Sequence, residues 1–253
     1  SYVTLTPTQK KIFDEYLEQE IPHSRASSYL GETTSTRTAV RIASGLLFRN
    51  QEGDVENAIE IIEWLLPLQY SDPKYIEYGT WKTSIKNDRY DENWREFIGI
   101  ELILILERHE HLLPSGLVAR IKESLLHAAQ GAKDRDVEPS YTNIGVMSAF
   151  LMAHVGKLME RPKIGEMGLL KAWQIYTLFN RDDCFSEFNS PTYDGVTMMG
   201  LAFWRELGPS EEMRTMGAEL ETLFWERVAN FYHAGFQNMV GPFFRSYGMD
   251  MRR

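Results

Sequence analysis

Two kinds of helical segment alternate along this chain, and the alternation limits the folds that are open to it. Segments of one kind place apolar residues at steps of three and four with charges between them, which is typical of helices with one wet face. They are Thr8–Gln19, Val55–Leu66, Gly116–Ala129, Glu166–Leu178 and Ser210–Tyr232. Segments of the other kind are apolar nearly all round, which predicts helices buried on both sides. They are Ile98–Leu106, Ile144–Val155 and Gly195–Trp204, with an earlier member at Ser35–Arg49.

The segments predicted to be buried recur at a regular interval. Their equivalent first residues lie 49, 50 and 54 residues apart, at Trp94, Asn143, Tyr193 and Tyr247. One outer and one inner helix in about 50 residues indicates an array of α-hairpins. An open solenoid would leave its inner helices partly wet, whereas a closed ring buries them around a funnel. The apolar inner helices therefore predict an all-α fold, an α/α toroid (barrel) of about five helical hairpins.

No linker divides the sequence. The longest irregular segment, 69–90, is rich in Tyr, Lys and Asp and predicts a long loop between hairpins. We therefore predict a single toroid domain over residues 1–253. Residues 246–253 resemble the first turn of another inner helix, so we expect a truncation at the C-terminal end, or an incomplete six- or seven-hairpin ring. The sequence starts at Ser1, so a secretory signal can be missing, and cytoplasmic and secreted locations both stay open.

Composition excludes several classes of partner. The 253 residues hold 27 Lys+Arg against 36 Asp+Glu, a net charge of −9, without the basic cluster that a nucleic acid requires. The single cysteine, Cys184, allows neither an intramolecular disulfide nor a thiolate zinc site. No His-x-x-x-His pair and no Gly-rich phosphate loop occurs, so we predict no metal and no cofactor. No apolar stretch approaches the ~20 residues of a membrane span, so no membrane partner is predicted. The oligomeric state stays open.

The loops that lead into the inner helices are the candidate site. In a ring of hairpins these loops gather at one end of the funnel, and here they are rich in polar and aromatic residues. The opposite loops, such as 161–165 and 208–212, are short and plain. Aromatic rings with polar tips suit a sugar-like ligand, which predicts a small-molecule or oligosaccharide substrate. The candidate substrate contacts are Trp94, Arg95, Tyr141, Glu187, Asn189, Asp194, His233 and Asp250.

The hairpin repeat, with Asn143, Tyr193, Arg245 and Tyr247 at the starts of the inner helices, resembles the α/α-toroid catalytic domains of polysaccharide lyases and related glycan-active enzymes. The resemblance implies β-elimination on a uronate-containing glycan. Asn143 would neutralise the uronate carboxylate, Arg245 would clamp it, and Tyr247 or Tyr193 would act as the acid and base. In several such families a His stands beside the neutralising Asn, whereas Ile144 stands here.

Carboxylates at the same end of the funnel offer a second chemistry. An inverting glycoside hydrolase uses one protonated and one ionised acid, and Glu187 with Asp91 or Asp250 would serve. Acids at helix starts also favour the helix dipole, which explains most of this set without catalysis. The set is Asp88, Asp91, Glu92, Glu96, Glu187, Asp194 and Asp250.

Two further alternatives remain. Methionines on the inner helices would suit a toroid dehydratase, isomerase or cyclase that acts on an apolar, terpene-like substrate, although such residues are mostly core. They are Met147, Met152, Met198 and Met199. Cys184 is the only cysteine in the sequence that could take part in that reaction. An array of α-hairpins also serves as a binding scaffold without catalysis. An enzyme gathers its residues in a deep pocket, whereas a scaffold presents them on an open surface.

Overall fold

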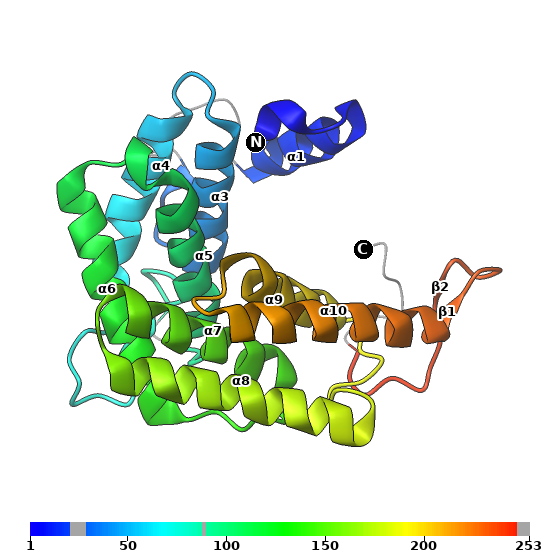
Figure 1. Cartoon of the computed structure of the whole chain (residues 1–253). Helices are drawn as coiled ribbons and strands as arrows, with labels where there is room; N and C mark the ends of the chain where they lie inside the picture. The colour runs from blue at the N-terminus through cyan, green and yellow to red at the C-terminus, as the bar shows by residue number, and fades with distance from the viewer. Residues whose placement is uncertain (21–28, 88–89, 247–253) are drawn as a thin grey trace. The chain divides into compact units, whose positions relative to one another are not determined.

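Helices make up most of the chain, as the alternating segments predict. The computed structural model describes residues 1–20, 29–87 and 90–246, and within these ranges the protein is all-α (Figure 1). The helices are α1 (Pro7–Glu20), α3 (Thr36–Arg49), α4 (Asp54–Leu65), α5 (Trp94–His109), α6 (Ser115–Arg135), α7 (Thr142–Leu158), α8 (Pro162–Asp182), α9 (Asp194–Leu207) and α10 (Glu211–Phe231). Every predicted segment overlaps one of these helices, and the largest error in length is at the end of α6.

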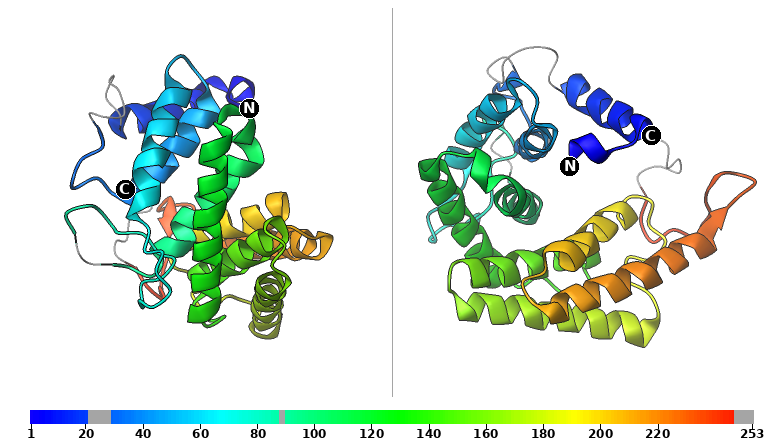
Figure 2. Two further views of the ribbon diagram at one scale, coloured as in Figure 1. Left: turned by 90° about the vertical axis from the view of Figure 1, so that its left-hand side faces the viewer. Right: turned by 45° about the horizontal axis from the view of Figure 1, so that its top comes forward.

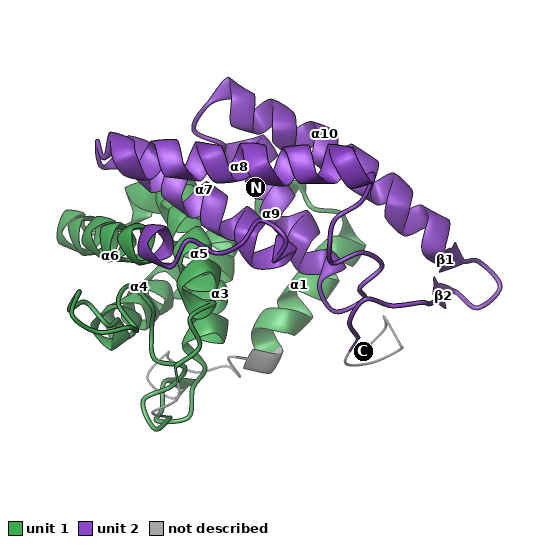
Figure 3. Ribbon diagram, turned by 90° about the horizontal axis from the view of Figure 1, so that it is seen from below, with its two compact units in different colours: residues 1–131 green, residues 132–253 purple. Residues whose placement is uncertain are grey.

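The chain divides into two compact units, Ser1–Gly131 and Ala132–Arg253 (Figure 3). In unit 1, α3 packs against α4 and α5, and α1 packs against α3. Residues of α5 from Arg95 to Leu106 are buried except Leu104, so the prediction of a fully buried helix is confirmed there. Between the 3-10 turn Leu66–Leu68 and α5 the described residues form no helix, as predicted.

Unit 2 consists mainly of two helical hairpins. The α7–α8 hairpin and the α9–α10 hairpin pack through α7 against α9, and α10 runs alongside α8 (Figure 2). Two short antiparallel strands follow α10, namely β1 (Tyr232–His233) and β2 (Asn238–Met239). The fully buried Trp204 of α9 donates its indole N–H to the carbonyl oxygen of Val146 in α7 at 2.8 Å. This bond gives the buried indole a partner and joins the two hairpins.

The inner helices of unit 2 differ in burial. Every residue of α7 from Thr142 to Gly156 is buried, which confirms the prediction. The prediction is wrong for α9, which buries one face while Met198 and Met199 stay partly exposed. The error has a physical cause, since an apolar segment without charges shows no polar face even when one side contacts solvent.

Candidate functional site

The first turn of α7 is bound to a carboxylate from the loop before α9. The backbone N–H of Asn143 donates to Oε2 of Glu187 at 2.8 Å, and its side-chain Nδ2 donates to both carboxylate oxygens at 2.9 Å. Both residues are buried. The N-cap of α7 is Tyr141, whose side chain makes no cap hydrogen bond. Glu187 therefore satisfies a free N–H of the first turn and places negative charge at the positive end of the helix.

The loop before α9 is held by side chains that bond to backbone. The Nδ2 atom of Asn189 donates to the carbonyl oxygens of Val240 and Pro242 at 2.8 and 2.7 Å. The hydroxyl of Ser190 donates to the carbonyl oxygen of Arg245 at 2.6 Å. Asn189 has a φ of 46°, a left-handed conformation that Asn tolerates better than most residues. These bonds attach the 240–245 segment to the start of α9.

A second buried carboxyl lies at the first residue of α9. Oδ1 of Asp194 accepts from the backbone N–H of Ser190 at 3.1 Å, and Oδ2 has no hydrogen-bond partner among the described residues. Burial raises the pKa of Asp194 to about 7, the Ser190 N–H acts against this shift, and the charge of Glu187 adds to it. Asp194 therefore keeps its proton to a much higher pH than an ordinary carboxyl group, which suits a group that gives or takes a proton.

Glu187, Asp194 and Arg245 belong to one electrostatic cluster. Burial raises the pKa of Glu187, while the two Asn143 donors and the charge of Arg245 act to lower it. Arg245 is exposed, and its guanidinium carbon lies 5.6 Å from the ring centre of Tyr193. Tyr193 is half-buried at the N-cap of α9. The arrangement places a phenol and a guanidinium outside two buried carboxyls.

The structure thus brings together six of the candidate residues within unit 2, namely Asn143, Glu187, Asn189, Tyr193, Asp194 and Arg245. Half-buried Tyr141 stands two residues before Asn143, at the N-cap of α7. Tyr247 and Asp250 lie outside the described residues.

Three candidate residues are placed elsewhere. Trp94 and Arg95 begin α5 in unit 1, where the buried Arg95 donates Nη2 to the carbonyl oxygen of Tyr78 at 2.9 Å. Exposed His233 lies in β1, with its ring centre 4.5 Å from that of Phe236.

Sequence reasoning missed a buried lysine that holds the chain before α7. Nζ of Lys171 donates to Oδ1 of Asp136 at 2.5 Å and to the carbonyl oxygen of Val137 at 2.6 Å. Only 3% of Lys171 is exposed. A signal was present in the sequence, because helical spacing places Lys171 on the same face of α8 as Ile164, Gly168, Ala172 and Ile175.

An aromatic pocket of about 330 Å³ adjoins the loop before α9. Four phenylalanines contribute to its wall, together with Cys184, Asn189 and Arg227; they are Phe185, Phe188, Phe224 and Phe231. Burial raises the pKa of the Cys184 thiol, which therefore stays protonated at neutral pH. Oδ1 of Asn189 has no hydrogen-bond partner among the described residues. The pocket offers apolar rings together with polar and charged side chains.

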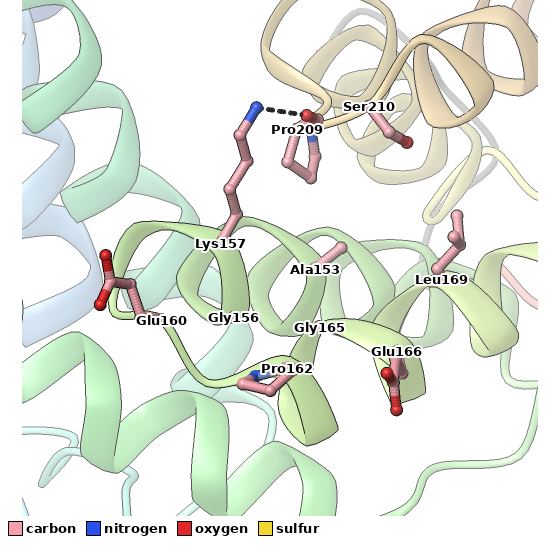
Figure 4. A pocket seen from close by; sticks show the side chains of 10 residues that line it. All are labelled: Ala153, Gly156, Lys157, Glu160, Pro162, Gly165, Glu166, Leu169, Pro209 and Ser210. Atoms are coloured by element: carbon pink, nitrogen blue, oxygen red, sulfur yellow. Dashed lines mark hydrogen bonds between the residues drawn. The ribbon is translucent and has the colours of Figure 1, made fainter.

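The opposite end of the α7–α8 hairpin carries a different pocket. This pocket, of about 440 Å³, lies between the α7–α8 turn and the loop before α10 (Figure 4). Nζ of Lys157 reaches across to the carbonyl oxygen of Pro209 at 2.7 Å, while Glu160 and Glu166 point away from that contact. The two acids are exposed, so this end lacks the buried carboxyls of the other.

Comparison with known proteins identifies the family of the chain but no function. Within the described ranges no group of three or more possible metal-binding side chains occurs, and each helix there is too short or too polar to cross a bilayer. No curated protein and no solved structure matches the chain. The family model for a domain of unknown function, DUF8769, matches residues 7–253, and the chain belongs to this family.

Proposed function

We propose that this protein is a glycan-active enzyme that cleaves a uronate-containing glycan by β-elimination. The observation that supports the proposal is the pair formed by Tyr193 and Arg245 beside the buried Glu187 and Asp194. A guanidinium is well suited to bind a carboxylate with two hydrogen bonds, and a phenol at hydrogen-bonding distance can transfer a proton.

In the proposed reaction, Arg245 neutralises the uronate carboxylate and so acidifies the C5 proton. Tyr193 in its phenolate form removes that proton, the C5–H electron pair forms the C4=C5 double bond, and the C4–O bond breaks. Tyr193, now a neutral phenol, returns the proton to the leaving oxygen and becomes a phenolate again. Tyr247 is the alternative acid from the sequence. Asn143 acts as a positioning residue, because its amide already donates to Glu187.

We also propose that the hairpins belong to an α/α toroid of about five hairpins. The proposal is supported by the repeat of about 50 residues and by the burial of α5 and α7, which occupy inner positions in that repeat. In this arrangement the starts of α5, α7 and α9 would share one end of the funnel.

Hydrolysis by paired carboxyl groups is the second candidate function. A pKa of about 7 for Asp194 favours it, because a glycosidase needs a carboxyl group that is protonated at working pH beside an ionised one. Glu187 would be the partner, since its charge contributes to the raised pKa of Asp194.

One assay separates the two chemistries. The protein is incubated with polygalacturonate, alginate and hyaluronan as acidic glycans and with xylan as a neutral one, and two products are followed. Elimination creates both a new reducing end and the ultraviolet absorbance of an unsaturated uronate, whereas hydrolysis creates the reducing end alone. Reducing ends without the absorbance would exclude the lyase and retain the hydrolase.

Variants then test the residue roles. For the lyase, Tyr193→Phe should lower kcat at least 100-fold and Arg245→Ala should raise KM, whereas the exposed Tyr232→Phe serves as a control with unchanged kinetics. Full activity of Tyr193→Phe and Arg245→Ala on every cleaved glycan would contradict the assignment.

A further inference from the structure

A second pocket, in unit 1, is lined by basic and aromatic side chains. It has a volume of about 630 Å³ and lies among α1, α3 and the C-terminal part of α5. Its apolar wall includes Phe13, Phe48 and Leu104, and its polar wall includes Arg41, Arg108 and His109. Pockets for small organic ligands have about this volume and the same division between an apolar wall and a few polar groups.

The aromatic wall of the pocket is well supported. The ring centres of Phe13 and Phe48 lie 5.4 Å apart, and the ring of Tyr2 contacts both. The hydroxyl of Tyr2 donates to Oδ2 of Asp14 at 2.6 Å. Oδ1 of Asp14 lies 3.8 Å from Nη1 of Arg49. The negative charge of Asp14 is therefore balanced beside the aromatic cluster.

Positively charged side chains also line this pocket, although the whole chain carries −9. Arg108 is exposed in the last turn of α5 and forms no ion pair with an acid among the described residues. Burial lowers the pKa of the neighbouring His109, and the charges of His111 and Arg108 lower it further. His109 is therefore mostly neutral at pH 7, and the cations that line the cavity and favour an anion in it are Arg41 and Arg108.

One buried acid lies next to Arg41. Oε1 of the buried Glu101 lies 3.9 Å from Nε of Arg41, a long contact for an ion pair. Burial raises the pKa of Glu101, while Arg41 and a hydrogen bond with Ser44 oppose the shift. A single buried carboxyl against Arg41 and Arg108 leaves an excess of positive charge at this pocket.

We propose that this pocket binds a small organic anion, a carboxylate with an apolar body. Arg108 and Arg41 would bind the carboxylate and the body would contact Phe13, Phe48 and Leu104. This pocket shares no lining residue with the cluster around Glu187. Binding of the anion here therefore does not depend on the glycan reaction proposed above.

Calorimetric titration with three probes tests the proposal. They are 4-phenylbutyrate, the uncharged 4-phenylbutanol with the same body, and inorganic phosphate, which has charge without a body. We expect phenylbutyrate to bind at least tenfold more tightly than either of the others. Equal affinity for the acid and the alcohol, preference for phosphate, or no binding of phenylbutyrate at millimolar concentration would each overturn the proposal.

Two variants locate the binding. Arg108→Ala should weaken phenylbutyrate at least tenfold and leave phenylbutanol unchanged, and Leu104→Trp should block both by filling the cavity. Arg120→Ala is the matched control, because Arg120 is an exposed arginine of the same unit that pairs with Glu63 outside the pocket. Arg108 is exposed, so Arg108→Ala should fold normally, and unchanged binding by that variant would contradict the proposed site.

Discussion

The two ends of unit 2 are built on different principles. At the starts of α7 and α9, side chains far apart in sequence are buried and bonded to one another, as in the contact of Asn143 with Glu187 across 44 residues. At the α7–α8 turn the packing depends on backbone contact instead, with glycines where the helices cross. Buried polar groups are costly to keep in place. Their concentration at one end is the reason why we propose that end as the functional one.

A glycine at each end gives the largest expected contrast. A Cβ atom at Gly156 would lie 2.3 Å from the backbone nitrogen of Gly165 and 2.4 Å from its Cα, so α7 and α8 would have to separate. Gly156→Ala should lower the free energy of unfolding by about 4 kcal/mol, near the upper end for single substitutions. Urea denaturation measures the change.

The matched control for this substitution is Gly195→Ala, at the polar end. A Cβ atom at Gly195 would meet no other atom within 4 Å. Alanine in the first turn of α9 should be neutral or stabilise by up to about 1 kcal/mol. A loss below about 1 kcal/mol for Gly156→Ala would show that the backbone contact at the α7–α8 turn is adjustable.

Removal of the Glu187 carboxylate is the next largest effect. Glu187→Ala leaves the backbone N–H and the amide of Asn143 without their buried acceptor. The free energy of unfolding should fall by about 3 kcal/mol, and Glu187→Gln, which keeps one acceptor oxygen, should cause about half that loss. Thermal unfolding followed by circular dichroism measures both.

Glu219→Gln is a control for these variants, since exposed Glu219 accepts a hydrogen bond from the hydroxyl of Tyr176 at the surface. Its effect should stay within about 0.5 kcal/mol. Equal losses for Glu187→Ala and Glu219→Gln would remove the distinction between a buried polar network and ordinary surface contacts.

Asp194 gives the polar end a dependence on pH. Its folded pKa of about 7 exceeds the ordinary value of 3.8, so the folded state holds the proton more tightly than the unfolded chain. The resulting stability is complete below pH 3.8 and is lost as pH rises through 7; the difference of the two pKa values corresponds to about 4 kcal/mol. The titration of Asp194 should therefore make the protein less stable as the pH rises from 4 to 8.

Asp194→Asn removes that titration while its carbonyl oxygen still accepts from the Ser190 N–H. The new amide nitrogen would take the place of Oδ2, which has no hydrogen-bond partner among the described residues. Its unpaired N–H groups offset part of the gain in stability. The variant should be about 1–2 kcal/mol more stable than the parent at pH 8 and less stable at pH 4. Denaturation at both pH values measures this, and parallel pH profiles for the two proteins would show that Asp194 is not the group that titrates.

The sequence predicted the helices, and it placed the candidate residues that the structure brings together in unit 2, because both depend on local pattern. Helical periodicity located α7 and α8, and polar residues before apolar runs located Asn143, Tyr193 and Asp194. It did not predict which residues would be partners. The partners of Asn189 are two backbone carbonyls about 50 residues away, and a carbonyl has no sequence signature.

Burial was harder to predict than helix position. α9 reads as fully apolar, but Met198 and Met199 stay partly exposed, because hydropathy does not record how many neighbours a helix has. Lys171 shows the opposite case, since its charge predicts exposure while its helical spacing predicts burial, and the spacing is right. Hydrogen bonds to Asp136 and Val137 make that burial possible.

The smallest expected effect is at the pocket beside the α7–α8 turn. Lys157 is exposed, and its bond to the Pro209 carbonyl replaces one that water would supply. Lys157→Met should therefore change the free energy of unfolding by less than about 0.5 kcal/mol, since the methionine keeps most of the apolar stem against the pocket. A loss above about 1.5 kcal/mol in urea denaturation would mean that this end also depends on a polar side chain. The difference between the ends would then be one of degree, and the pocket beside Lys157 would be as good a candidate site as the cluster around Glu187.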